Sequence, residues 1–341
     1  MTILLAVIMI GVLVFAHELG HFLAAKASGI MVLEFAVGMG PLVLSRQVGE
    51  TRYSLRLLPI GGFARMAGED VDEANNLVPD HRRYDKKPLY ARALVSVAGP
   101  LTNFLLAALI FAVVFMFMGV PSEQPLVGAL SPGWPAAAAG LEVGDRIVSI
   151  AGQPVERWQD IQPLVADWDG QQTTIVVERA GQQLSFPITP WADQETGQVM
   201  IGIGPQSERF SFLGSIAMGW QETVWFTDQI ISILSNMVTG KIPAEGAGPI
   251  GMIVMVGEVA RTGFVNLLTF AAIISIQLGL FNLLPIPALD GSRLVFFLIE
   301  AVRGKPVDPE KENMVHFLGF VLLMVFMVLI TFKDLQRLNI F

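Results

Sequence analysis

Four long apolar stretches are the strongest constraint on what this chain can fold into. Each approaches or exceeds about 20 residues, the length at which a helix spans a bilayer. Hydrophobic residues make up 53% of the chain and charged residues 15%, whereas soluble domains carry about 25% charge. We therefore expect a polytopic α-helical membrane protein with about four transmembrane helices, at about 1–25, 95–118, 265–287 and 313–332.

The first stretch has the length of a secretory signal but lacks its other features. It has no basic segment at its start and no convincing cleavage site of small residues, and it contains His17 and Glu18. We expect it to be retained as a transmembrane helix.

Net charge and cysteine content exclude several classes of protein. The net charge is -8, which gives no broad basic field, and we therefore expect no nucleic-acid partner. The chain has no cysteine, which excludes disulfides, thiolate zinc sites and cysteine nucleophiles. Any metal would have to use histidines and carboxylates.

The distribution of basic residues predicts an orientation in the membrane. Residues 26–92 contain ten Lys or Arg, whereas residues 119–261, more than twice as long, contain only six. The positive-inside rule places the first of these segments in the cytoplasm. The middle domain and both termini are then extracytoplasmic, and the loop 287–312 returns to the cytoplasm.

Local sequence patterns divide the chain into four regions. Residues 1–118 form the first part of the membrane domain, and their segment at about 30–66 alternates like strands, with tight turns expected at GMGP and PIGG. Residues 122–206 have the composition of a soluble α+β domain. Residues 207–262 are predicted to be an amphipathic extracytoplasmic linker region. Residues 263–341 complete the membrane domain.

The most informative chemical motif is HELGH at 17–21. His17 and His21 lie four residues apart on one helix face, where both imidazoles can reach one ion, and Glu18 can accept a proton from an activated water. Ionisable groups near a helix centre in lipid cost on the order of 2.5–3.5 kcal/mol each, and a metal offsets that cost. The alternative is an interfacial histidine pair with Glu18 bound to Lys26.

A catalytic zinc usually takes three protein ligands and keeps one open position. Candidates for the third are His81 in a charged loop, His316 at the start of the fourth apolar stretch, and Asp290 in NLLPIPALDG. Asp290 is preferred because the prolines of this motif break the helix, and because the predicted orientation puts it at the depth of the HELGH histidines. An ordinary helix-capping aspartate is the alternative.

Several segments together resemble the site-2 protease family of intramembrane zinc metalloproteases, in its bacterial branch with a PDZ domain. The segments occur in the order that this family shows: HELGHFLAAK at 17–26, EFAVGMGP at 34–41, LLPIGGFARMAGED at 57–70, AGPLTNF at 98–104 and NLLPIPALDG at 282–291. The resemblance implies a multi-pass protein of the bacterial inner (plasma) membrane with its active site near the cytoplasmic face.

The same resemblance implies roles for individual residues. His17, His21 and Asp290 would bind Zn²⁺, and Glu18 would act as general base and acid. Asn282 would bind substrate or stabilise the transition state, and the glycine-rich strands would form a membrane-associated β element that holds substrate extended. Asn103 also lies on a family asparagine, for which we expect a packing or hydrogen-bonding role between helices.

Residues 131–155 resemble part of a PDZ domain, through SPGWPAAAAGL and GDRI. PDZ grooves bind peptides by strand addition. In this chain the extracytoplasmic PDZ-like domain could bind a peptide terminus or act as a size filter.

The predicted function is an intramembrane zinc metalloprotease that uses zinc-activated water to cleave transmembrane segments of single-span proteins. By resemblance, the substrates are anti-sigma factors or signal-peptide remnants. A metal transporter and a catalytically inactive scaffold are the alternatives. The expected partners are membrane-protein or peptide substrates and the lipid bilayer, and the oligomeric state is left open.

Overall fold

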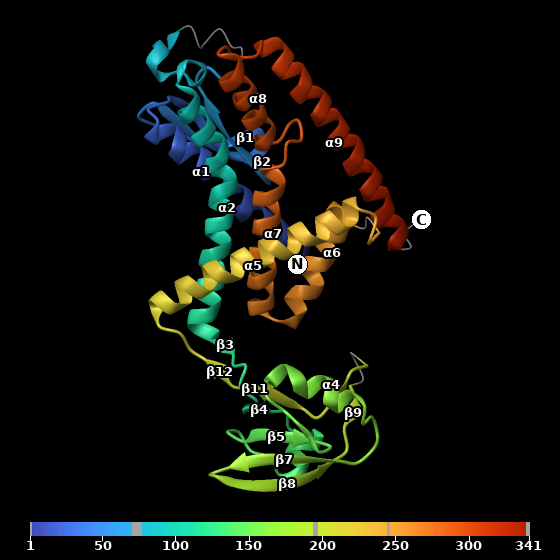
Figure 1. Cartoon of the computed structure of the whole chain (residues 1–341). Helices are drawn as coiled ribbons and strands as arrows, with labels where there is room; N and C mark the ends of the chain where they lie inside the picture. The colour runs from blue at the N-terminus through green and yellow to red at the C-terminus, as the bar shows by residue number, and fades with distance from the viewer. Residues whose placement is uncertain (1, 70–76, 194–196, 244–245, 339–341) are drawn as a thin grey trace. The chain divides into compact units, whose positions relative to one another are not determined.

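Among the residues that this computed structural model describes, four helices are long and apolar enough to cross a membrane, as the apolar stretches predict (Figure 1). They are α1 (Thr2–Ala27), α2 (Leu89–Met118), α7 (Phe264–Asn282) and α9 (Pro309–Arg337). The structure describes residues 2–69, 77–193, 197–243 and 246–338. These fall into two compact units, unit 1 with residues 1–114 and 215–341 and unit 2 with residues 115–214.

The third span is shorter than its hydropathy predicts. Residues 283–289 are mostly apolar, but α7 ends at Asn282 and a turn segment leads to α8 (Asp290–Arg303). Pro285 and Pro287 account for the difference, since a proline cannot donate the backbone hydrogen bond that would continue the helix. The early end of α7 frees the residues before Asp290 to turn back towards α1.

Close backbone approach fixes how α1 and α2 pack. A side chain on Gly20 of α1 would lie 2.3 Å from the carbonyl oxygen of Ala98 on α2. The two helices therefore need a glycine at this position. At the far end of α1, Ala6 and Met9 pack in one cluster with Val256 of α6 (Pro249–Thr262) and Leu267 of α7.

The segment between the first two spans forms two long, bent strands, β1 (Val32–Val48) and β2 (Thr51–Met66). The tight turn lies at residues 49–50, not at the predicted GMGP and PIGG sequences. Those glycines lie inside the strands, where Gly38, Gly40 and Gly61 adopt positive φ at irregularities in the pairing. The register pairs Phe35 with both Tyr53 and Ala64, and the first half of β1 therefore lies between two segments of β2.

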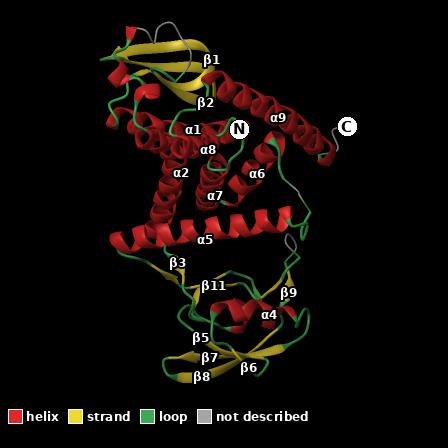
Figure 2. Ribbon diagram, turned by 45° about the horizontal axis from the view of Figure 1, so that its top comes forward, coloured by secondary structure: helices red, strands yellow, loops and turns green. Residues whose placement is uncertain are grey.

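Two short 3-10 helices, η2 (Asp80–Arg82) and η3 (Tyr84–Lys86), follow the hairpin. The predicted amphipathic region 207–262 contains α5 (Phe212–Val238), which crosses α2 in both ribbon views (Figures 1 and 2). A side chain on Gly219 of α5 would lie 2.4 Å from the carbonyl oxygen of Ala108 on α2. α5 is therefore packed directly against a predicted span.

Unit 2 is an α+β domain built mainly from short strands and turns. Its four-stranded sheet has the order β6-β5-β7-β8, and three two-stranded ladders pair β3 with β12, β4 with β11 and β9 with β10. The strands are β3 (Val120–Pro121), β4 (Val127–Leu130), β5 (Arg146–Ile150), β6 (Gln153–Pro154), β7 (Thr173–Arg179), β8 (Gln182–Ile188), β9 (Trp191–Ala192), β10 (Val199–Met200), β11 (Ile203–Pro205) and β12 (Ser207–Glu208). The helices are α3 (Pro135–Ala139), η4 (Trp158–Asp160) and α4 (Ile161–Ala166).

The core of unit 2 follows from strand alternation. On β7, Ile175 and Val177 are fully buried, whereas Thr174 and Glu178 on the opposite face are exposed. They pack with Ile147 and Ile150 of β5 in one apolar cluster.

Candidate metal centre

The last turns of α1 carry the HELGH motif into the interior of unit 1. His17 and His21 are each 8% exposed, and their ring centroids lie 4.8 Å apart. The four-residue spacing puts both rings on one face of the helix, as the sequence predicts. Lys26, offered above as a partner for Glu18, instead donates a hydrogen bond to Glu50.

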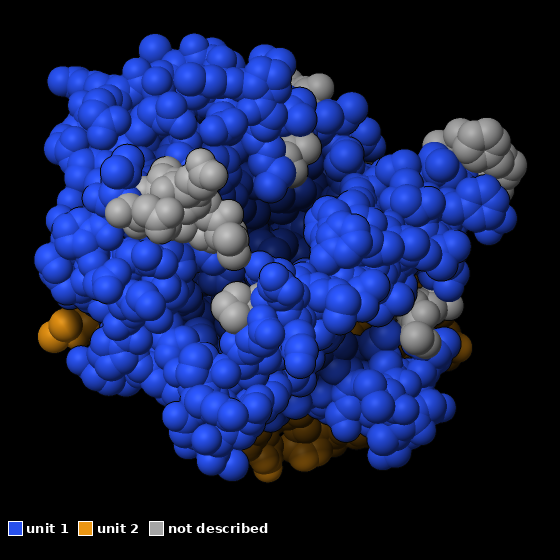
Figure 3. Space-filling model, turned by 90° about the horizontal axis from the view of Figure 1, so that it is seen from above, with its two compact units in different colours: residues 1–114, 215–341 blue, residues 115–214 orange. Residues whose placement is uncertain are grey.

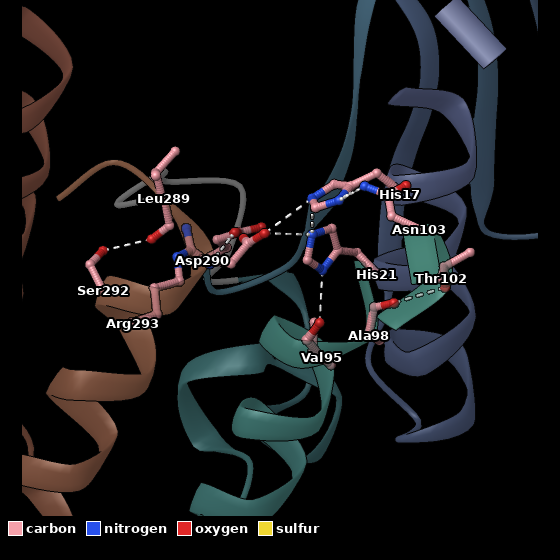
Figure 4. Close-up of polar contacts among 11 residues, drawn as sticks. His17, His21, Val95, Ala98, Thr102, Asn103, Leu289, Asp290, Ser292 and Arg293 are labelled. Atoms are coloured by element: carbon pink, nitrogen blue, oxygen red, sulfur yellow. Dashed lines mark hydrogen bonds and ion pairs between the residues drawn. The ribbon is translucent and has the colours of Figure 1, made fainter. Parts of the chain in front are cut away.

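Asp290 reaches this face from the first position of α8. The N-cap position of α8 is occupied by Leu289, and Asp290 follows it as the first helical residue. Its Oδ2 lies 3.1 Å from His17 Nε2 and 3.4 Å from His21 Nε2. Figure 4 shows the three side chains pointing toward one another. The geometry favours a ligand over a capping aspartate.

The three donor atoms have the spacing that a zinc ion requires. The two Nε2 atoms lie 3.1 Å apart, and the distances to Asp290 Oδ2 are 3.1 and 3.4 Å. Zinc–ligand bonds of about 2.0–2.1 Å in a tetrahedral site put neighbouring ligand atoms about 3.3 Å apart. Two imidazoles and one carboxylate are also a ligand set that catalytic zinc uses. The residues present therefore fit Zn²⁺.

Hydrogen bonds behind the imidazoles leave their Nε2 atoms facing the donor cluster. His21 Nδ1 donates to the carbonyl oxygen of Val95 at 2.7 Å. His17 Nδ1 lies 3.2 Å from the side-chain amide of Asn103, which is fully buried. Within the described residues, the amide oxygen of Asn103 has no other partner. Turning this amide lets its oxygen accept the Nδ1 proton of His17, as a metal-ligating histidine requires.

Gly99 of α2 leaves the space in which the donor atoms meet. A Cβ at this position would lie 2.3 Å from His21 Nε2 and 2.8 Å from His17 Nε2. Any side chain here would therefore displace one or both imidazoles. The next residue, Pro100, lies inside α2 without ending it.

Glu18 and Asn282 line the same cleft as the three donor residues. The cleft has a volume of about 710 Å³, and β2, α8 and α9 also contribute to its wall. Figure 3 shows the surface of unit 1, which is hollowed on the face seen there. A side chain on Gly62 of β2 would lie 3.3 Å from Glu18 Cγ, which places the hairpin directly against the acid.

An ion pair between Glu69 and Arg293 forms part of the lining of the cleft. The two side chains lie 2.6 Å apart. Burial opposes the charge on Arg293, but the carboxylate of Glu69 outweighs it and raises the pKa of Arg293. The guanidinium is therefore a permanent cation near Asp290.

Asp290 itself remains ionised in this setting. Burial opposes its charge, but its contacts with the two histidines hold the pKa of Asp290 below its usual range. It therefore presents an anionic oxygen to the cluster.

The structure brings together the five residues to which the sequence assigned metal-binding, catalytic or substrate-binding roles. His17, His21 and Asp290 form the cluster, and Glu18 and Asn282 lie beside it. His81 lies on η2 and is not among the residues lining the cleft, whereas His316 is.

Two contributors were not anticipated from the sequence: Gly99, which has no side chain to displace the imidazoles, and the carbonyl of Val95. Asn103 was expected to hydrogen-bond between helices, and its contact with His17 agrees with this. AGPLTNF was noted as a motif, but its residues could not be assigned to the metal site without the structure.

These features define a class: membrane-embedded metal-dependent hydrolases with an HExxH helix and a carboxylate ligand from a later segment. The model of peptidase family M50 matches residues 5–326. The chain belongs to this family, and its predicted resemblance to the site-2 proteases is confirmed. It is a zinc metalloprotease of the membrane, with Zn²⁺ as its cofactor.

Two curated relatives span nearly the whole chain. The zinc metalloprotease RasP of Geobacillus kaustophilus is 37% identical over 408 residues and covers 97% of each chain. The regulator of sigma-W protease RasP of Bacillus subtilis is 35% identical over 418 residues and covers 99% of each chain.

Among solved structures, the PDZ domain of an SdrC-like protein from Listeria monocytogenes matches 25% of this chain and 88% of its own. The identity is 24% and the TM-score 0.22.

Proposed function

We propose that this zinc metalloprotease cleaves transmembrane segments of single-span membrane proteins at the cleft that contains Glu18. The observation that carries the proposal is the convergence of His17 Nε2, His21 Nε2 and Asp290 Oδ2 at tetrahedral spacing beside this acid. All three would hold the zinc ion. Bound zinc supplies Lewis acidity, which lowers the pKa of water and polarises the peptide carbonyl.

Glu18 is the proton carrier of the reaction. It lies next to His17 in sequence, lines the cleft and projects from the same helix end as the two histidines. In this position it takes the proton of the attacking water and returns it to the leaving amine. Because one group performs both transfers, replacing its carboxylate by an amide blocks the reaction without removing a metal ligand.

Substrate must be unwound before it can be cut. Every backbone carbonyl of a membrane-spanning helix is satisfied within the helix and is closed to attack. Residues 63–66 of β2 line the cleft, and pairing with this strand would compensate an extended substrate for its lost helical hydrogen bonds. The side-chain amide of Asn282, on the same wall as Asp290, would hold the substrate backbone.

We place the cleft at the cytoplasmic face and unit 2 outside the cytoplasm. The support is the concentration of Lys and Arg in residues 26–92. Unit 2 would then act as a PDZ-like filter or peptide-binding domain that admits substrates already shortened outside. The B. subtilis relative is named as a regulator of sigma-W, and an anti-sigma factor is accordingly the substrate class we would test first.

The test is cleavage of a single-span model substrate by purified protein in detergent. Wild type should cleave and carry about one zinc per chain, whereas Glu18→Gln should carry the same zinc and not cleave. Glu258→Gln, on the exposed side of α6, is the matched control and should cleave normally. Cleavage by Glu18→Gln at the wild-type rate would refute the assignment.

A further inference from the structure

His316 on α9 is bonded to the segment that delivers Asp290. Its Nδ1 accepts a hydrogen bond from the backbone N–H of Ala288 at 3.1 Å. Ala288 lies two residues before Asp290 and has a φ of 76°. This left-handed conformation is unfavourable for a residue with a Cβ, and it persists only where surrounding contacts hold it.

Two further contacts hold the same segment. Ser292 Oγ donates to the carbonyl oxygen of Leu289 at 2.7 Å, a bond drawn in Figure 4. One turn after His316, a side chain on Gly319 would lie 2.3 Å from Cβ of Pro287 and 2.6 Å from its carbonyl oxygen. Since His316 and Gly319 share a helix face, this face of α9 packs directly on residues 287–288.

Near its other end, α9 contacts the start of α6, where Asp334 accepts hydrogen bonds from the backbone N–H groups of Gly248 and Gly251. Most of the apolar surface of α9 is exposed, including the large side chains of Phe317, Leu318 and Leu322. An imidazole in a predicted span is costly unless it has a use. Here its Nδ1 accepts a hydrogen bond from the backbone N–H of Ala288, a residue with positive φ beside the metal centre.

The hydrogen bond also fixes the tautomer of His316. Because Nδ1 accepts, the ring proton of the neutral imidazole is on Nε2. That atom lies 3.8 Å from a carboxylate oxygen of Glu312, one turn earlier on α9. It has no hydrogen-bond partner within the described part of the chain. Nδ1 is therefore the atom through which His316 holds Ala288.

We propose that His316 is a positioning residue for the zinc site, an inference that rests on the ligand set proposed above. By accepting the Ala288 N–H it keeps residues 288–289 in the conformation that aims Asp290 at His17 and His21. Zinc–ligand distances stay within about 0.2 Å of their standard values, and the position of the carboxylate therefore matters. Losing this acceptor lets Ala288 relax from its left-handed conformation and moves the carboxylate away from the two imidazoles.

The test is a matched pair of substitutions in the full-length protein. In His316→Asn the amide oxygen occupies the position of Nδ1, whereas His316→Leu has nearly the same branched shape without an acceptor. Zinc affinity is measured by chelator competition, and the visible spectrum of the Co²⁺-loaded protein reports ligand geometry. We expect Leu to weaken zinc binding about tenfold, at the lower end for residues behind metal ligands, and to change the Co²⁺ spectrum. Asn should stay within about threefold of wild type.

The inference is overturned if His316→Leu binds zinc like wild type, or if Asn and Leu weaken binding equally. It is also overturned if Leu only raises KM for the substrate, since that result would make His316 a substrate contact. Gly319→Ala is a second variant that should also weaken zinc about tenfold, by pushing Pro287. If His316→Leu does not fold, this variant decides, and wild-type affinity in it overturns the inference.

Asp290→Ala, run in the same assay, separates the two proposals. If it keeps wild-type zinc affinity, the proposed ligand set is wrong. If it loses zinc while His316→Leu and Gly319→Ala keep it, only the positioning role of α9 is wrong.

Discussion

Two carboxylates of unit 1, the buried Glu34 and the partly buried Asp290, are held in different ways. Glu34 on β1 is 2% exposed and accepts hydrogen bonds from Ser54, Arg52 and Arg56. Burial alone would raise its pKa, but these donors lower the pKa of Glu34 to about 2. Asp290 instead faces two imidazole nitrogens, and the nearby guanidinium of Arg293 is paired with Glu69.

The difference separates a structural carboxylate from a ligand. The charge on Glu34 is balanced by cations within the chain, and its role is complete when the hairpin has folded. The cluster at Asp290 gathers three electron-pair donors at one point, a polar arrangement that a bound cation completes. Both carboxylates are held in the ionised form, and their partners decide their use.

Gly99→Ala should have the largest effect on the metal side of this comparison. The new Cβ falls 2.3 Å from His21 Nε2, and we expect zinc affinity to drop about 100-fold, the upper limit for changes behind the ligands. Alanine favours helix, and α2 should therefore form normally. Chelator competition measures the affinity, and thermal unfolding of the metal-free protein is the control. Unchanged affinity would mean that the metal lies elsewhere.

Asn103→Leu should have a smaller effect on the same site. It removes the amide oxygen that accepts from His17 Nδ1 and keeps the volume of the side chain, and we expect about tenfold weaker zinc binding. Asn103→Asp restores an acceptor and should recover most of the affinity. Equal losses in both variants would show that Asn103 only packs between helices.

Glu34→Gln should act on stability alone. It leaves Arg52 and Arg56 without their counter-charge, and because both are partly exposed we expect a loss of about 2 kcal/mol in unfolding free energy. Zinc affinity should be unchanged within about twofold. Denaturant unfolding in detergent and chelator competition measure the two quantities. A large loss of zinc affinity would show that Glu34 also affects the metal site.

The pH dependence of stability gives the smallest effect. Since the pKa of Glu34 is lowered from 4.5 to about 2 in the folded protein, its contribution is fully present above about pH 4.5 and is lost as pH falls towards 2. The difference in unfolding temperature between wild type and Glu34→Gln should therefore shrink between pH 5 and pH 3. A constant difference would mean that the carboxylate charge does not stabilise the hairpin.

The predictable parts of the molecule depend on short sequence patterns. Apolar runs of span length identify α1, α2, α7 and α9 because hydropathy requires no tertiary information. The spacing of His17 and His21 fixes their common face for the same reason. For Asp290, the distribution of basic residues predicted only that it lies at the same membrane depth as His17 and His21.

The remaining features depend on tertiary contacts. The end of α7 at Asn282 was missed because hydropathy counts residues 283–289 as apolar although two prolines break them. The positions of Gly99 and Asn103 beside the histidines depend on the rotation of α2 about its axis, which no local pattern encodes. The glycines of the hairpin led us to expect turns, but they lie at bends in continuous strands. A glycine with positive φ occurs both in tight turns and at strand irregularities, and the sequence does not distinguish the two.

X-ray absorption at the zinc edge tests the central claim most directly. The zinc of the wild-type protein should show two imidazole nitrogens and a carboxylate oxygen at about 2.0–2.2 Å. The carboxylate should be lost in Asp290→Ala and kept in Glu34→Gln. A spectrum without two imidazoles, or one that Asp290→Ala leaves unchanged, would contradict the assignment of His17, His21 and Asp290 as the zinc ligands.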